Sequence, residues 1–212
     1  MAENVITATP APHEMEKLKH APEELGLHPI IAARWSPRSF SERQISAQDL
    51  TKILLAATWA ASSYNEQPWR FIVGRRGDAT FQKILDCLVE FNQAWARSAA
   101  ALVLSIGKKT FSHNGAANKF ALYDTGAATA NLMLEAIALG IHSHGMAGFD
   151  ADKARAVFKI PEDFEIGAVI ALGYLGDVSS LPEKLQKQET AARSRKPLQE
   201  VVFSDWEQPA KF

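Results

Sequence analysis

Two runs of apolar residues constrain the fold of this chain most strongly. The first, "AAALVLSIG" at residues 99–107, is short and almost wholly apolar, which is typical of a buried strand. The second, "EIGAVIALGYLG" at residues 165–176, is rich in β-branched residues and is also predicted to be a strand. Between them, "TGAATANLMLEAIALGI" has the length of a helix, and Gly140 suits its C-terminal end. We therefore expect a buried helix that packs with buried strands.

The remaining elements alternate irregularly between helix and strand. In "SAQDLTKILLAATWAAS", Ser46 is the expected N-cap, and Asp49 lies in the first turn of the predicted helix. Asp150 is expected to cap a helix that Pro161 stops. Helices are also predicted for "GLHPIIAARWS", ending near Arg34, and for "DATFQKILDCLVEF", and strands for "WRFIVGRR" and "IHSHGMAGF". This irregular order favours an α+β architecture over a regular doubly wound sheet.

Length and composition are compatible with one domain. The 212 residues, 47% of them hydrophobic, are enough for a sizeable core. Residues 1–20 are polar and contain prolines, so we expect a flexible N-terminal arm or a loose first helix there. Residues 21–212 are expected to form a single domain.

The overall charge and the single cysteine exclude several classes of protein. The chain carries 23 basic and 24 acidic residues, a balance that gives no electrostatic case for nucleic acid or an anionic membrane. Cys87 has no second cysteine to pair with and is expected to be a core thiol. The longest apolar stretch is shorter than the roughly 20 residues that span a bilayer, and the N-terminus resembles no targeting signal. We expect a cytoplasmic protein.

Familiar catalytic motifs are absent from the sequence. It contains no GxGxxG, GxxxxGK[ST] or GxSxG motif, which disfavours a dinucleotide fingerprint, a phosphate loop and a serine hydrolase. His142 and His144 would share one face of a strand and could bind a metal, but no third ligand stands at a characteristic spacing. We therefore predict no metal site, and the histidines are expected to line a pocket or to bond to the backbone.

Arginines alternate with serines at two distant places in the chain. Arg34 and Arg38 flank Ser36 in "RWSPR", and a second pair, Arg193 and Arg195, stands in "RSR". These clusters are either solvated charges or two halves of a phosphate clamp, because guanidinium groups bind phosphate through paired hydrogen bonds.

Four motifs, in order, resemble the FMN-dependent nitroreductase family. They are "RWSPRSF", "SSYNEQPWRF", "GMAGF" and "RSRKPLQEVV", and the resemblance covers about residues 27 to 203. The stretch "YDTGAATANLMLEAIALGIHSHGMAGFD" is similar to a branch of the family whose members often lack an assigned substrate.

The resemblance implies a nitroreductase-like α+β fold with a central, largely antiparallel sheet surrounded by helices. It further implies a homodimer with FMN at the subunit interface and a C-terminal arm that reaches the partner protomer. NAD(P)H would be the electron donor, in a ping-pong reaction with a small-molecule acceptor.

The resemblance also assigns residues to the cofactor. Arg34, Ser36 and Arg38 would approach its phosphate, ribityl chain and pyrimidine edge, with Arg38 as the best candidate for the positive group near N1 and O2. Asn92 would pair with the pyrimidine edge, and Trp95 stands where relatives often carry lysine. The full implied set is Arg34, Trp35, Ser36, Arg38, Ala61, Ser62, Ser63, Asn65, Asn92, Met146, Ala147, Gly148, Arg193 and Arg195.

Two turns have distinct expected roles. The resemblance implies that a backbone N–H of Ala147 or Gly148 points at the flavin N5, whereas the local sequence alone favours an ordinary strand-ending turn. The turn "ASSYNEQPW" would form the wall of the FMN site that is bound mainly by the other protomer. In that turn, Pro68 fixes the exit and Trp69 begins a strand as an apolar anchor.

No side chain is assigned as catalytic, because the flavin carries the hydride. A substrate proton would come from water, His144 or Tyr123. The acceptor would lie under the segment "KTFSHNGAANKFALYD"; an alternative is that Phe120 and Tyr123 belong to the first turn of a core-facing helix. The substrate candidates are Phe111, His113, Asn118, Phe120, Tyr123 and His144.

The leading hypothesis is an FMN-dependent NAD(P)H oxidoreductase that reduces nitroaromatics, quinones or related conjugated acceptors. The alternatives are a flavin-binding or storage protein with slow turnover, and other chemistry on the same fold, namely flavin fragmentation or reductive dehalogenation.

Overall fold

The computed structural model of the chain describes residues 9–211. Its centre is a sheet of four strands, β1 (Trp69–Arg75), β2 (Ala101–Lys108), β3 (His142–Met146) and β4 (Phe164–Gly173). Their order is β1-β2-β4-β3, and every neighbouring pair is antiparallel. The predicted α+β fold with a largely antiparallel sheet is therefore confirmed.

The two apolar runs form the two central strands. Strand β2 is buried along nearly its whole length, which explains why the sequence shows no polar alternation there. A register shift interrupts the β2–β4 pairing between Leu104 and Ile106. At this shift, the side chain of Ser105 replaces the missing backbone pairing. Its hydroxyl donates to the carbonyl of Ala168 (3.0 Å) and accepts from the N–H of Ala168 (2.9 Å).

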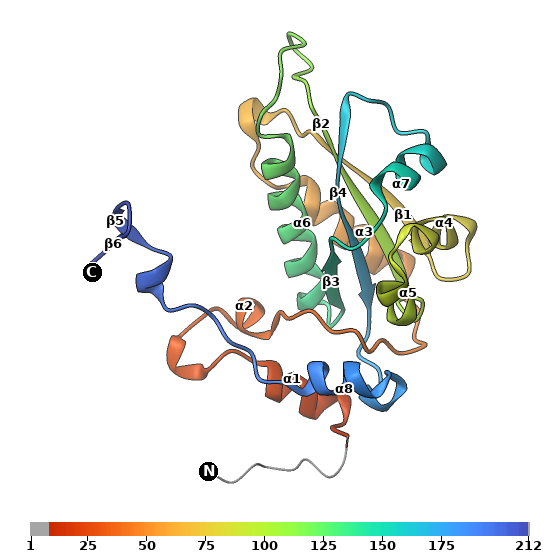
Figure 1. Cartoon of the computed structure of the whole chain (residues 1–212), viewed down its shortest axis with the longest axis vertical. Coiled ribbons are helices and arrows are strands. Elements are labelled where there is room, and N and C mark those ends of the chain that lie inside the picture. The colour runs from red at the N-terminus through yellow and green to blue at the C-terminus, as the bar shows by residue number, and fades with distance from the viewer. Residues whose placement is uncertain (1–8, 212) are drawn as a thin grey trace.

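Helices cover both faces of the sheet (Figure 1). Helices α3 (Ala47–Thr58) and α6 (Ala121–Ala138) form one core layer, in which Ile53 and Leu132 pack with Val103 and Ile170. On the other face lie α4 (Ala79–Cys87), α5 (Glu90–Ala96) and α7 (Ala151–Phe158). Caps predicted from the sequence are present: Ser46 accepts from the N–H of Asp49, Asp150 accepts from Lys153, and Gly140 has a left-handed φ of 70°.

The N-terminal helices and the segment that follows β4 pack together at one end of the molecule (Figure 1). They comprise α1 (Pro12–Lys19), η1 (Glu23–Leu25), α2 (Pro29–Ala33), η3 (Val178–Ser180) and α8 (Glu183–Thr190). Of the two alternatives for residues 1–20, residues 12–19 form a helix, whose Met15 packs with Trp35 and Val178. Residues 1–8 of the predicted arm lie outside the described residues.

Tertiary contacts override the sequence pattern at several places. The single helix predicted for "DATFQKILDCLVEF" is two helices, because Leu88 is extended, buried and bridged to Phe149. The helix predicted to stop at Pro161 ends earlier, where Lys159 adopts a left-handed φ of 53°. Cys87 is buried as expected, and burial raises the pKa of its thiol. None of the helices between residues 9 and 211 combines the length and apolarity that a membrane crossing requires.

Beyond α8, the chain leaves the body of the protein as a C-terminal arm, defined here as residues 196–211 (Figure 1). The arm contains η4 (Leu198–Glu200), β5 (Phe203–Asp205) and β6 (Gln208–Pro209). Its apolar side chains are poorly covered, with Leu198 63% and Trp206 79% exposed.

Candidate cofactor site

Both arginine clusters line one pocket of about 230 Å³, which we call the arginine pocket. One wall is the segment after α2, and the other is the last turn of α8 with the chain that follows it. Residues that are more than 150 positions apart in the sequence are thus joined at one site. The lining residues are Lys19, Arg34, Trp35, Ser36, Arg38, Gln188, Glu189, Arg193 and Arg195.

Positive charge dominates this pocket. Its cations face one carboxylate, that of Glu189. Burial and then the neighbouring Arg195 lower the pKa of the Arg34 guanidinium, and burial, Arg195 and Arg34 lower the pKa of Arg193. Crowded cations that destabilise one another are stabilised by an anion, and a phosphate accepts hydrogen bonds from several guanidinium groups at once. The arrangement therefore fits the phosphate clamp rather than two solvated charge clusters.

The arginines are held by different contacts. Arg193 Nη1 donates to the carbonyl of Ala32 (3.0 Å) and to that of Lys19, so it ties the tail to α1 and α2. Among residues 9–211, Arg195 Nη1 donates only to the adjacent carbonyl of Ser194 (2.7 Å). Arg34 Nη1 reaches the hydroxyl of Ser36 at 3.5 Å. Arg193 thus has a structural contact beyond its charge, whereas Arg195 is tethered only to its own segment.

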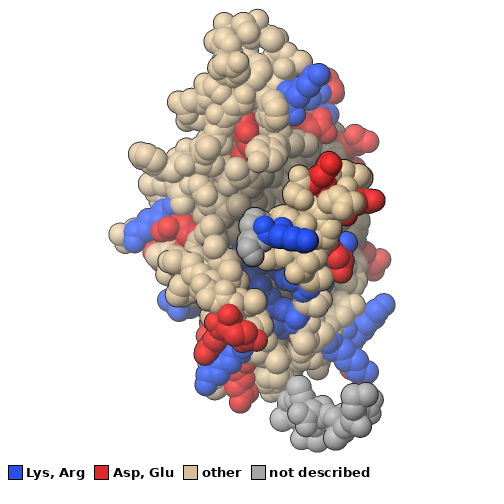
Figure 2. Space-filling model, turned by 90° about the vertical axis from the view of Figure 1, so that its left-hand side faces the viewer, with Lys and Arg blue, Asp and Glu red and all other residues tan. Residues whose placement is uncertain are grey.

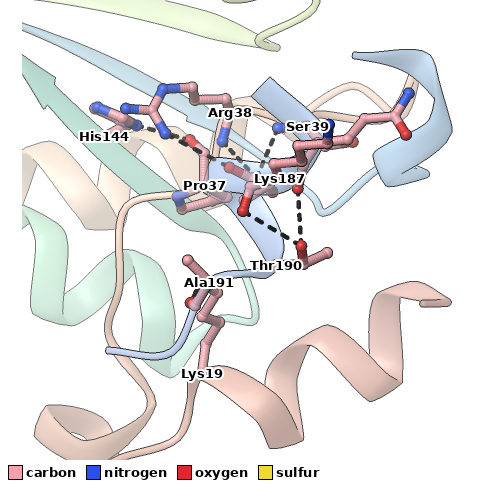
Figure 3. Close-up of polar contacts among 10 residues, drawn as sticks. Lys19, Pro37, Arg38, Ser39, His144, Lys187, Thr190 and Ala191 are labelled. Carbon is pink, nitrogen blue, oxygen red and sulfur yellow. Dashed lines mark hydrogen bonds and ion pairs between the residues drawn. The ribbon is translucent and has the colours of Figure 1, made fainter. Parts of the chain in front are cut away.

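Arg38 and His144 lie side by side next to Pro37 (Figure 3). His144 Nδ1 donates to the carbonyl of Pro37 (2.9 Å), and its ring packs 4.6 Å from that of Trp95. Burial is the main reason why the pKa of His144 is lowered to about 4. At neutral pH the imidazole is therefore uncharged and its Nδ1 proton is engaged, which disfavours His144 as the substrate's proton donor.

Asn92 meets the turn after β3. Its amide Nδ2 donates to the carbonyl of Gly148 (3.0 Å), and a Cβ at position 148 would lie only 2.7 Å from that nitrogen. Ala147 is exposed, whereas the Met146 side chain is packed in the core, so that only the backbone of Met146 could face a cofactor. The structure thus brings the two predicted cofactor segments, around residues 92 and 147, into contact.

The turn "ASSYNEQPW" lies far from the arginine pocket, at the end of the molecule where α6 begins (Figure 1). Ser63 N–H donates to the buried Asp124 carboxylate at the start of α6 (3.0 Å). Tyr64, Asn65 and Gln67 have left-handed φ values of 53°, 54° and 52°. Between residues 9 and 211, no hydrogen bond or ion pair joins this turn, including Ala61 and Ser62, to the arginine pocket.

The segment of substrate candidates is anchored to this turn. The Glu66 carboxylate accepts from the N–H (2.9 Å) and the hydroxyl (2.6 Å) of Ser112, and the ring of Tyr64 packs against those of Phe111 and His113. These contacts hold the segment in one position above the start of α6.

The remaining substrate candidates differ in exposure. Asn118 is buried and its Oδ1 accepts from the N–H of Phe120 (3.0 Å), so it serves the turn before α6. Phe120 is the N-cap of α6 and Tyr123 lies in its first turn, as the alternative expected of a core-facing helix, but their side chains are 56% and 78% exposed and do not face the core themselves.

The two histidines of β3 do not form a metal site with their neighbours. His142 is buried 3.5 Å from Glu16, whereas His144 contacts Pro37 and Trp95. Within the described part of the chain, no three His, Cys, Asp or Glu residues are grouped so that they could hold a metal ion. His142 also borders a larger pocket of about 650 Å³ between α1, η1 and the end of α6, which contains none of the predicted cofactor residues.

Sequence reasoning missed three residues of the arginine pocket, namely Lys19, Gln188 and Glu189. Lys19 lies in the segment expected to be an arm or a loose helix. Gln188 and Glu189 lie in "EKLQKQET", a polar stretch whose composition gives no sign of burial. No signal in the sequence alone marks them.

The chain is an α+β protein whose two arginine clusters line one cationic pocket, and comparison with known proteins places it in a family. The sequence model of the nitroreductase family matches residues 31–174, which is more than half of the chain, so the chain belongs to this family. The crystal structure of an oxidoreductase containing FMN is 34% identical, with a TM-score of 0.82, over 93% of this chain and 97% of that one.

Two curated relatives are 36% identical to this chain. One is an uncharacterized 15.4 kDa protein of Mycolicibacterium smegmatis, aligned over 66% of this chain and 99% of its own length. The other, from Archaeoglobus fulgidus, is provisionally named an NADH dehydrogenase/NAD(P)H nitroreductase, and the alignment covers 70% of this chain and 84% of the relative.

Proposed function

We propose that the protein is an FMN-dependent NAD(P)H oxidoreductase with the FMN phosphate in the arginine pocket. The observation that carries the proposal is the convergence of both arginine clusters on one pocket whose positive charge exceeds its negative charge. The similar FMN-containing oxidoreductase and the NAD(P)H in the archaeal relative's name support the cofactor and the electron donor.

Arg38 and two segments outside the pocket lining would hold the rest of the cofactor. Arg38 supplies a fixed positive charge that would favour the reduced, anionic flavin. The Asn92 amide would present a donor and an acceptor to the pyrimidine edge, and an N–H of Ala147 or Gly148 would face N5. When bound, FMN accepts a hydride from NAD(P)H and passes electrons to an acceptor such as a nitroaromatic or a quinone. The protein itself would bind the flavin, orient it towards the donor and the acceptor, and polarise it.

A homodimer would complete this site. The turn "ASSYNEQPW" and the segment around Phe111 lie at the opposite end of the molecule from the arginine pocket, so a second protomer is the way for them to reach a flavin. The exposed apolar side chains of the C-terminal arm support an arm that packs on the partner. The side of the molecule in Figure 2 also fits an interface, since the left-hand part of its upper half shows few charged residues while Lys and Arg gather in a hollow below.

Anaerobic flavin spectroscopy tests the proposed function. The purified protein, loaded with FMN, is mixed with NADH and then with NADPH while the flavin absorption near 450 nm (roughly the usual oxidised-flavin band) is followed. We expect bleaching by at least one nucleotide and recovery on addition of a quinone or a nitroaromatic. A protein that cannot be loaded with FMN would refute the proposal, and a loaded protein that neither nucleotide bleaches would favour the flavin-storage alternative.

A further inference from the structure

The carboxylate of Glu189 is the one negative group in the lining of the arginine pocket, and the proposed function gives it no role. It lies in the last turn of α8 and is 1% exposed. Its Oε1 accepts from the N–H groups of Arg38 (2.7 Å) and Ser39 (3.1 Å), and its Oε2 lies 3.8 Å from Arg38 Nη1. One side chain therefore holds both the backbone and the guanidinium of the main cofactor candidate.

Electrostatics alone would disfavour a carboxylate at this place. A negative charge beside a phosphate site repels the phosphate, and burial raises the pKa of Glu189 against the opposing effect of its hydrogen bonds and cations. A buried carboxylate is tolerated when it satisfies donors that would otherwise be unpaired. Here those donors are the backbone N–H groups of the segment that carries the pocket's arginines.

Lys19 extends the network to a third segment. Its Nζ donates to the carbonyl of Ala191, just beyond Glu189 (Figure 3). The same Nζ lies 5.2 Å from the centre of the Trp35 ring. Ser39 also donates through its hydroxyl to the carbonyl of Asp177 (2.7 Å). The end of α1, the 35–39 segment and the end of α8 are thus joined around Glu189, immediately before Arg193 and Arg195.

We propose that Glu189 is a positioning residue for the phosphate end of the cofactor site: it holds Arg38 in place and fixes the 36–39 backbone against the start of the tail that carries Arg193 and Arg195. This inference rests on the proposed FMN function. It makes a prediction of definite sign. If Glu189 were only an adverse charge, its removal would tighten the binding of a phosphate; as a positioning residue, its removal weakens that binding.

The test compares FMN with riboflavin, which lacks the phosphate. Wild type and variants are stripped of flavin, and each ligand is titrated by the quenching of flavin fluorescence. For Glu189→Ala, which loses both acceptor oxygens, we expect FMN to bind at least about tenfold more weakly, a loss typical of a charge-assisted contact. The riboflavin affinity should fall by much less, because riboflavin has the ring that Arg38 would face but lacks the phosphate. For Glu189→Gln, which keeps one acceptor oxygen but loses the charge, we expect an intermediate loss that is again larger for FMN than for riboflavin.

Glu183→Ala is the matched control. Glu183 lies on the same helix and pairs only with Lys187, 2.9 Å away on the exposed surface, so both affinities should remain at the wild-type values. A Glu189 variant that binds FMN as tightly as wild type, or more tightly, would overturn the inference. An equal loss for riboflavin would also overturn it, because it would indicate general damage to the fold.

Glu189→Gln keeps the test decisive if Glu189→Ala fails to fold, because the same two outcomes apply to it. Failure of the proposed function is visible separately: a wild-type protein that binds neither FMN nor riboflavin would overturn the function itself, before any variant is compared.

Discussion

At the scale of residues, side chains of the same type have unequal roles. Arg193 and Arg195 are two positions apart and line the same pocket, but only Arg193 donates to carbonyls of the N-terminal segments. Removal of Arg193 takes away the side-chain donor to the Lys19 carbonyl and one of the two donors to the Ala32 carbonyl, which also accepts from the N–H of Ala21, whereas removal of Arg195 mainly removes charge.

The first prediction separates these two roles. The double variant Arg193→Ala with Arg195→Ala should lose most of its FMN on gel filtration, because half of the clamp is gone. Among the single variants, Arg195→Ala should weaken FMN binding without a change in Tm of the flavin-free protein, whereas Arg193→Ala should lower both. Full FMN retention by the double variant would show that the tail arginines do not hold the phosphate.

The second prediction concerns the contact between Gly148 and Asn92. In Gly148→Ala, the new Cβ would lie 2.7 Å from Asn92 Nδ2 and 3.1 Å from Val89 Cγ2, so the Asn92 side chain has to move. We expect a loss of about 1–3 kcal/mol in the free energy of unfolding, measured by urea denaturation. In an Asn92→Ala background the same exchange should cost less, because the closest atom is absent. An equal cost in both backgrounds would contradict the crowding by Asn92.

At the scale of elements, the ends of the helices are fixed by short polar contacts. Asp78 is the example at α4: its Oδ1 accepts from the N–H of Phe81 (2.6 Å) and its Oδ2 from that of Arg75 (2.8 Å). One carboxylate thus joins the end of β1 to the start of α4. The backbone hydrogen bonds from Phe81 and then Arg75 are the main reasons why the pKa of Asp78 is lowered.

The third prediction follows from the sign of that shift. Because the pKa is lower in the folded than in the unfolded state, the charged Asp78 stabilises the fold above its unfolded pKa of about 3.9, and this contribution is lost as the pH falls through the folded pKa. Asp78→Ala should therefore destabilise the protein by about 1 kcal/mol at pH 7, and the difference from wild type should shrink in acid.

Urea unfolding at neutral and acidic pH measures the Asp78 effect. Asp86→Ala is the control, since its carboxylate accepts on the same helix from the Gln82 side chain and caps no backbone group. A difference between wild type and Asp78→Ala that persists unchanged in acid would contradict the role of the charge.

Elements with a strong pattern of their own could be predicted from the sequence. The two central strands and α6 could be predicted because their sequences are strongly apolar, and the caps Ser46 and Asp150 mark the starts of their helices. The elements that were not predicted correctly depend on contacts between distant segments. Leu88 breaks a helical pattern because it is buried beside Phe149, and α8 is a polar helix that is positioned by the burial of Glu189 and Leu185.

The candidate site also has features that could be predicted from the sequence and features that could not. The residue types of the arginine clusters pointed to a phosphate, because the chemistry lies in the side chains themselves. Their union in one pocket, and the presence of Lys19 and Glu189, depend on how the two ends of the chain pack, and no local pattern encodes that packing.

At the scale of the whole molecule, large apolar side chains are left uncovered around the start of α6. Trp59 is 85% exposed, Tyr64 84% and Tyr123 78%. The hydrogen bond from Ser63 to Asp124 places the turn after α3 beside this end of α6. Such a patch is typical of an interface, which supports the proposed homodimer.

The fourth prediction tests this interface. Wild type should elute with twice the chain mass of 23.3 kDa, whereas Trp59→Arg should elute as a monomer and lose FMN although its arginine pocket is intact. Val157→Arg is the control, because Val157 is 38% exposed on α7, which covers the other face of the sheet. Light scattering and flavin absorption across the protein peak give both readings. A monomeric variant that keeps its FMN would contradict a shared site.

The arginine pocket also has a consequence for the order of events during synthesis. Its walls come from residues 19–38 and 188–195, close to the two ends of the chain. A growing chain lacks the second wall until residues 188–195 have been synthesised, so a phosphate-bearing ligand has no complete pocket to enter before then. Once the ends have met, any ligand that binds only their joined form draws the folding equilibrium forward by mass action. The synthesis of α8 and of the tail that follows it thus decides when the chain becomes competent to take up its ligand.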